Sequence, residues 1–210
     1  MKLKSMRMLA LLLLLPVLTI IGLAMARQRA AEMPAVLWPV PEFRLLDQDS
    51  TPFSSQQLHG RVWLASFVYT NCPDVCPLVT HRMAALRDSL QRQDRPGNVG
   101  LLSFSVDPVR DSPAVLRAYA AQFRAAKPDW VFLTGALETV IPLVTQGFRL
   151  TAMHPAHLGH PHKSAGAADY TVTHTDRIVL IDRDGQVRGT YESSDPEALA
   201  RLRKDLERVD

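Results

Sequence analysis

The sequence predicts an α/β fold, with a mixed central sheet flanked by helices, behind an N-terminal membrane anchor. Short apolar runs alternate with stretches of helical periodicity between residues 61 and 147, and a strand–turn–strand pattern followed by a helix ends the sequence. Strands and helices that alternate in this way form a sheet covered by helices on both faces. The anchor is predicted from a long uncharged run near the N-terminus.

The uncharged run extends from Met8 to Ala26 and follows Lys2 and Arg7. About 18 apolar residues are enough to span a bilayer, and a positive flank keeps the N-terminus in the cytoplasm. We interpret residues 1–26 as an uncleaved transmembrane anchor or, alternatively, as a cleaved signal peptide. In either case the folded domain, expected at residues 41–210, lies on the periplasmic or intermembrane-space side of an inner membrane.

The segment after the anchor is expected to hold a linker and then only short elements. Residues 27–40 are rich in Ala and Pro without an apolar period, which is typical of a linker. Residues 43–47 fit a short strand, and residues 48–50 a turn into another strand. Residues 54–58 fit a single helical turn.

The middle of the domain alternates regularly between strand and helix. Residues 61–69 form an apolar run with high strand propensity, and residues 77–91 place apolar side chains at helical spacing. Residues 99–106 form a second apolar strand. A helix then follows at residues 113–124, because Ser112 is a favourable N-cap and the next residue is a proline suited to the first helical position.

The last part of the domain contains a short strand, a broken helix, a hairpin and a closing helix. Residues 130–133 are the strand, and the helix at residues 137–147 is expected to be interrupted near Pro142. The Asp-Gly pair at residues 184–185 predicts a hairpin between the flanking apolar runs. The final elements, in order, are strands at 177–182 and 186–191 and an amphipathic helix at 196–209 capped by Asp195.

The composition limits the classes of function. The formal net charge is +3 and the Lys and Arg residues are scattered, so nucleic-acid binding is not supported. Two cysteines are too few for a disulfide framework, and we therefore interpret them as a site.

Both cysteines lie at the predicted turn from the strand at 61–69 into a helix. Pro77 fits the first helical position, which would make Cys76 the N-cap and leave Cys72 in the preceding loop. Unpaired N–H groups at a helix start favour thiolate and predict a thiol pKa below about 8.5. Such a pair could form a redox disulfide or, with a third ligand, bind a soft metal such as Cu(I) or Zn(II). Two inert core cysteines or a structural disulfide fit the flanking prolines less well.

A third ligand would have to come from one of the seven histidines. His59 and His81 are expected at the surface or in packing. His174 precedes a strand expected to return towards the cysteine turn, which makes it a candidate ligand, although a lone histidine is most often structural. Four others lie in a stretch rich in Gly, Pro and Ala, and form either a weak copper-collecting loop or a solvated insertion: His154, His157, His160 and His162.

Over residues 41–191 the sequence resembles the Sco/SenC family of thioredoxin-like copper chaperones. The resemblance is carried by the cysteine stretch at 67–77, the Ser-Val-Asp-Pro stretch at 105–113 and the histidine stretch at 169–174. The family helps to assemble the dinuclear copper centre of cytochrome c oxidase. The resemblance therefore implies a thioredoxin-like fold, with the copper-containing subunit of a terminal oxidase as partner. Because the domain is expected outside the cytoplasm, a thiol reductant is a further expected partner that keeps the cysteines reduced.

The resemblance also implies a Cu(I) site made by Cys72, Cys76 and His174, and the family can bind Cu(II) as well. Residue 173 is Thr where the family often has Asp, which bears on Cu(II) more than on Cu(I). The main alternative is a membrane-anchored thiol–disulfide oxidoreductase in which Cys72 attacks and Cys76 resolves. In thioredoxin-type oxidoreductases a cis-proline commonly packs beside the thiol pair. No proline lies within residues 171–182 of this sequence, which disfavours a plain oxidoreductase. A peroxidase and a copper or redox sensor remain further alternatives.

Overall fold

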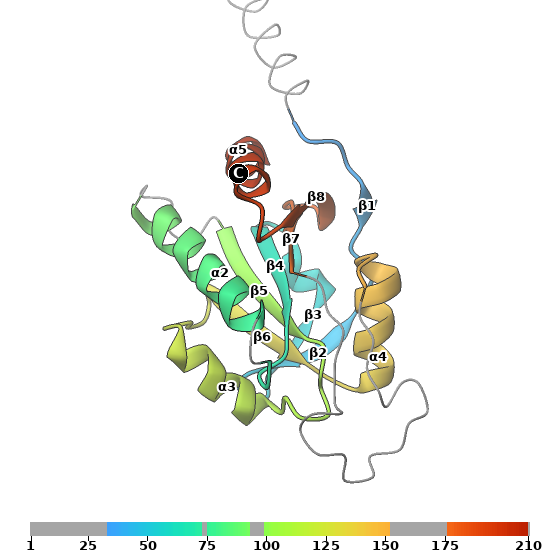
Figure 1. Ribbon diagram of the computed structural model, residues 1–210. Helices are drawn as coiled ribbons and strands as arrows, with labels where there is room; N and C mark the ends of the chain where they lie inside the picture. Colours follow the sequence, from blue (N-terminus) through green and yellow to red (C-terminus); the bar gives the residue numbers. More distant parts are fainter. Residues whose placement is uncertain (1–32, 73–74, 93–98, 152–175, 210) are drawn as a thin grey trace, which may run out of the picture. The chain divides into compact units, whose positions relative to one another are not determined.

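The computed structural model describes residues 33–72, 75–92, 99–151 and 176–209 (Figure 1). The predicted membrane segment at residues 1–26 lies outside these ranges, as do His174 and the four histidines of the Gly- and Pro-rich stretch. Within the described ranges, no helix has the length and apolar character needed to cross a membrane.

The described strands form one mixed sheet in the order β1-β8-β7-β4-β5-β6-β2-β3. Strands β4, β5 and β6 are parallel, whereas every other pairing is antiparallel. All residues of β4 and β5 are buried, as expected for strands with both faces covered. The strands are β1 (Trp38–Pro39), β2 (Arg44–Asp47), β3 (Pro52–Ser54), β4 (Val62–Val68), β5 (Val99–Ser105), β6 (Trp130–Thr134), β7 (Arg177–Ile181) and β8 (Gln186–Glu192).

Helices flank the sheet, with α2 and α3 on one side and α4 on the other (Figure 1). Ser112 accepts the Val115 N–H at the start of α3, and Asp195 accepts the Glu197 N–H at the start of α5, so both predicted caps are confirmed. The predicted interruption at Pro142 is also confirmed, since α4 ends there in a π-helical turn. The helices are η1 (Ser55–Leu58), α2 (Val75–Arg92), α3 (Pro113–Gln122), α4 (Leu137–Pro142), η2 (Leu143–Gly147) and α5 (Pro196–Val209).

The predicted linker ends earlier than residue 40, because β1 belongs to the sheet. Trp38 and Pro39 pair with β8, and the Leu37 N–H donates to the Val187 carbonyl at 2.9 Å. The Arg149 guanidinium lies 4.5 Å from the centre of the Trp38 ring. Two paired residues are too short to produce an apolar period, so composition alone suggested a linker.

An aromatic cluster packs β4 and β5 against the end of η2. The Phe104 ring of β5 stacks on Phe67 of β4, with centroids 5.6 Å apart, and meets Phe43 edge-on at the same separation. Phe148, just after η2, lies 5.1 Å from both Phe67 and Phe104. These contacts fix β4 and β5 against each other directly before the segments that carry the cysteines and their supporting loop.

Above pH 10 the domain is expected to lose stability through Tyr191 in β8. Its buried phenol donates a hydrogen bond to Asp205, and burial, followed by that hydrogen bond and charge, raises the pKa of Tyr191 well above its ordinary value. The unfolded chain releases the phenol proton near pH 10, whereas the folded chain retains it. Unfolding then releases a proton, so each further pH unit lowers the free energy of unfolding by up to about 1.4 kcal/mol.

A Tyr191→Phe variant should therefore show a flatter loss of stability between pH 10 and 11.5. Denaturant unfolding of the wild type and the variant across this range measures the effect. Between pH 6 and 8 the phenol does not titrate in either state, and the difference between the two proteins should be constant there. Parallel curves through pH 11.5 would contradict the assignment.

Candidate metal centre

The cysteine turn lies where two adjacent parallel strands end. It follows β4, and the loop at residues 106–112 follows β5. The Val106 N–H donates to the Val68 carbonyl at 2.9 Å, which joins the two segments at their starts. Ligands in α/β sheets commonly bind beyond the carboxyl ends of such strands.

Backbone N–H groups of Cys76 and Tyr69 donate hydrogen bonds to the two sulfurs. The Cys76 N–H donates to Cys72 Sγ at 3.4 Å, and the Tyr69 N–H donates to Cys76 Sγ at 3.4 Å. The Cys72 N–H in turn donates to the Tyr69 carbonyl at 3.3 Å. Both cysteines are in the thiol form, with Cys72 7% exposed and Cys76 fully buried. The turn therefore brings two potential sulfur ligands together, as the sequence predicted.

Helix α2 begins at Val75, so the prediction that Cys76 is the N-cap is wrong. Cys76 lies inside the first turn and Pro77 follows it there. The N–H groups of a first turn have no acceptor within the helix, and a proline is therefore tolerated at more than the first position. As a consequence the Cys76 N–H points out of the helix and is accepted by the Cys72 sulfur.

The prediction of a lowered thiol pKa is wrong for Cys76. Burial raises the pKa of the Cys76 thiol far above its ordinary value, although the Tyr69 N–H acts in the opposite direction. Charge on Cys72 and on Asp111 would raise the pKa further. Desolvation of a fully buried sulfur thus outweighs the favourable helix start. A metal that binds Cys76 as thiolate must displace this proton.

Asp111 is a residue of the site to which the sequence pattern assigned no role. Its fully buried carboxylate accepts the Thr70 hydroxyl at 2.6 Å and the Ser105 hydroxyl at 2.6 Å. It also accepts the Thr70 N–H at 3.2 Å. Burial raises the pKa of Asp111, while the hydrogen bonds from Ser105 and Thr70 lower it. Only its place in the stretch at 105–113, part of the family resemblance, pointed to it.

A second buried contact holds the start of α2 against α3. The Thr80 hydroxyl donates to the Cys76 carbonyl at 2.7 Å, and its oxygen lies 2.9 Å from the Tyr119 hydroxyl. Burial raises the pKa of Tyr119 to about 12, so the phenol is neutral at physiological pH. The backbone of Cys76 is therefore fixed from the α3 side as well.

The described histidines behave as expected for surface and packing residues. His59 and His81 are both exposed, and the His81 ring packs edge-on against Phe123 at 4.9 Å. Among the described residues, no group of three His, Cys, Asp or Glu side chains is arranged to hold a metal ion. His174, the third ligand predicted from the sequence, lies outside those residues.

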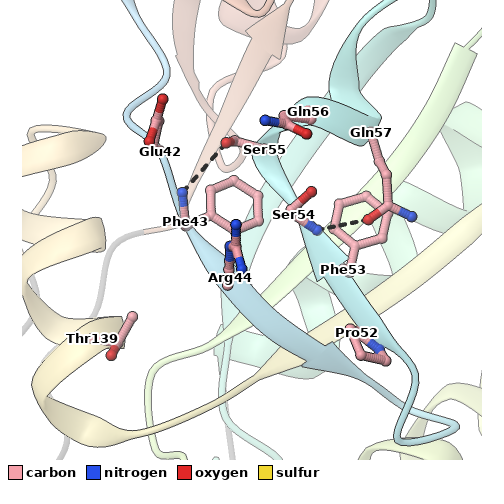
Figure 2. Close-up of a pocket in the computed structure, with 10 residues that line it drawn as sticks. All are labelled: Glu42, Phe43, Arg44, Pro52, Phe53, Ser54, Ser55, Gln56, Gln57 and Thr139. Carbon is pink, nitrogen blue, oxygen red and sulfur yellow. Dashed lines mark hydrogen bonds between the residues drawn. The ribbon is translucent and has the colours of Figure 1, made fainter.

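A cavity of about 570 Å³ lies beside the edge strand β3 and has no ligands for a soft metal (Figure 2). It is lined by β2, β3 and η1, with Thr139 of α4 on the far wall. None of its lining residues, all within the described ranges, has a thiol or an imidazole. They are Glu42, Phe43, Arg44, Pro52, Phe53, Ser54, Ser55, Gln56, Gln57 and Thr139.

Comparisons with known proteins bear on the family and the fold of this chain. Residues 38–209 match the SCO1/SenC family. The chain is 31% identical over 155 residues to the SCO1 protein homolog of Bacillus subtilis, covering 73% of this chain and 74% of that relative. The structure of Bradyrhizobium japonicum ScoI with copper bound is 28% identical, covers 79% of this chain and 98% of its own, and superposes with a TM-score of 0.63.

A structure of BsSco, described as a member of the Sco family of cytochrome c oxidase assembly proteins with a disulfide switch, superposes with a TM-score of 0.68. It is 26% identical and covers 85% of this chain and 98% of its own. The predicted α/β fold, with a mixed sheet flanked by helices, is confirmed by the likeness to these structures.

Proposed function

The chain belongs to the SCO1/SenC family, and on this premise we propose that it is a copper chaperone for cytochrome c oxidase assembly. In this proposal Cys72, Cys76 and His174 bind Cu(I), which is then passed to the recipient by ligand exchange. Copper is the cargo of the protein, and the recipient is the copper-containing subunit of a terminal oxidase.

The observation that carries the proposal is the pair of thiols that the β4–α2 turn brings together. Thiolates are soft ligands that suit Cu(I), and an imidazole would complete a trigonal set. The hydrogen bonds from the Tyr69 and Cys76 N–H groups already hold the two sulfurs on one turn. The copper-bound ScoI structure and the description of BsSco support the same role.

The proposed location follows from the N-terminal segment. As a transmembrane anchor, residues 1–26 would hold the domain on the periplasmic or intermembrane-space side of an inner membrane. Such compartments favour disulfides, so a thiol reductant is needed to keep Cys72 and Cys76 able to bind copper.

Anaerobic titration of the reduced full chain, in mild detergent, with Cu(I) and a competing chelator tests the proposal. We expect one tightly bound Cu(I) per chain, lost when the cysteines are oxidised to a disulfide. Incubation with an apo fragment of an oxidase copper subunit should then move the copper to the fragment. Failure to compete with the chelator would overturn the proposal.

A second candidate function is thiol–disulfide exchange on the recipient. The unequal exposure of the two cysteines favours it, since Cys72 is 7% exposed and Cys76 is fully buried. Attack by Cys72 on a partner disulfide and resolution by Cys76 would leave the partner with two thiols and this chain with a disulfide. Reduction of the recipient by a chain that binds no Cu(I) would favour this candidate.

A further inference from the structure

We propose that Asp111 is a positioning residue that sets the Cu(I) affinity of the cysteine pair by fixing the turn that holds both sulfurs. The inference rests on the proposed function and adds a determinant of affinity that does not itself bind the metal. It is drawn from contacts that join two loops at the ends of β4 and β5.

The first step is the set of hydrogen bonds that Thr70 donates to the Asp111 carboxylate. One carboxylate oxygen accepts the Thr70 hydroxyl at 2.6 Å, and both oxygens lie 3.2 Å from the Thr70 N–H. The second oxygen accepts the Ser105 hydroxyl at 2.6 Å. Thr70 is thereby held, through side chain and backbone, against the end of β5.

The second step is the position of Thr70 next to Tyr69. The Tyr69 N–H donates to Cys76 Sγ, and the Tyr69 carbonyl accepts the Cys72 N–H. A displacement of Thr70 would move the peptide groups of Tyr69 on which both cysteines depend. Asp111 therefore acts on the two sulfurs through one neighbouring residue.

The third step is the free-energy cost of burying the Asp111 carboxyl group. Asp111 is fully buried, and a buried carboxyl group destabilises a fold unless hydrogen bonds compensate. Here the hydrogen-bond donors are Thr70, just after β4, and Ser105, the last residue of β5. Hydrogen-bonded groups outside the ligand shell typically change metal affinity by about 10–100-fold when they are removed.

The test compares Asp111→Ala with Asp111→Asn by competition for Cu(I) against a chelator, using the full chain in detergent. Asp111→Ala removes every acceptor and is expected to lower the affinity about 10–100-fold. Asp111→Asn keeps an acceptor for Thr70, and its affinity should remain within about fivefold of the wild type. Far-ultraviolet circular dichroism and thermal unfolding establish that each variant is folded.

Asp182→Ala is the matched control. Asp182 is also a buried carboxylate, which accepts the Asp184 and Gln186 N–H groups and pairs with Arg188 at the β7–β8 turn. Its loss should lower stability and leave Cu(I) affinity unchanged. A milder variant, Thr70→Val, removes only the hydroxyl donor and should lower affinity severalfold if Asp111→Ala does not fold.

Three results would overturn the inference while the wild type binds Cu(I). The first is wild-type affinity in folded Asp111→Ala, or in Thr70→Val if the alanine variant does not fold. The second is an Asp111→Asn variant as weak as Asp111→Ala, and the third is an equal loss in Asp182→Ala. A wild type that binds no Cu(I) would instead overturn the proposed function.

Discussion

Replacing Cys76 with serine is expected to lower Cu(I) affinity on the order of a thousandfold. Serine is close to cysteine in size, and its oxygen can still accept the hydrogen bond from Tyr69. The fold should therefore tolerate serine at residue 76, although this position is fully buried. The hydroxyl keeps its proton at neutral pH and is a hard ligand, so the copper would lose one of its two sulfur ligands.

Competition titration of Cys72→Ser and Cys76→Ser against a Cu(I) chelator measures this effect. Both variants should lose tight binding to a similar extent, since the proposed site needs both thiolates. A Cys76→Ser variant within about tenfold of the wild type would show that Cys76 is not a ligand.

His174→Ala extends the same experiment to the proposed third ligand. Its loss should be smaller than that of either cysteine variant, because two thiolates alone can hold Cu(I). His81→Ala provides the control, since the exposed His81 packs on Phe123 in the described structure and should leave affinity unchanged. Equal affinities in the two histidine variants would remove His174 from the site.

Local sequence patterns were sufficient to predict most of the fold. The caps at Ser112 and Asp195, the break at Pro142 and the Asp-Gly turn each act within a few residues. The Gln186 N–H, for example, is accepted by the Asp182 side chain four residues earlier. Because these interactions join residues that are close in the sequence, local sequence patterns were enough to place the elements correctly.

The features that the sequence did not reveal depend on distant contacts. Thr70 and Asp111 are 41 residues apart, and nothing near either residue indicates that they meet. The raised pKa of Cys76 results from burial by the whole domain, whereas the local helix start alone suggested the opposite. Pairing of β1 with β8 likewise joins segments from opposite ends of the domain.

The candidate site was predicted in part for the same reason. The short spacing between Cys72 and Cys76 on a strand-to-helix turn was enough to place two thiols together. The spacing was not enough to predict that α2 begins at Val75, because proline is compatible with several positions in a first turn. The contribution of His174 stays a prediction.

Replacing Phe104 with alanine is expected to lower the free energy of unfolding by about 3–5 kcal/mol. The ring is fully buried in β5 and packs against Phe43, Phe67 and Phe148. Phe43 precedes β2, Phe67 lies in β4 and Phe148 follows η2. They cannot all move inwards to fill the space, so a cavity should remain.

Denaturant unfolding followed by tryptophan fluorescence measures the loss, and Val109→Ala is the control. Val109 is 52% exposed, and its truncation should change stability by no more than about 0.5 kcal/mol. A loss below about 1 kcal/mol for Phe104→Ala would mean that the aromatic cluster closes around the missing ring.

Copper provides a second readout of the same variant. A ligand that binds only the folded state raises the free energy of unfolding by an amount set by its concentration and dissociation constant. Phe104 lies one residue before Ser105, which donates to Asp111, but the ring itself packs on the aromatic cluster. If the ring acts only on the core, Cu(I) should stabilise Phe104→Ala and the wild type equally. A smaller copper-induced gain in the variant would show instead that core packing is transmitted through β5 to the cysteine turn.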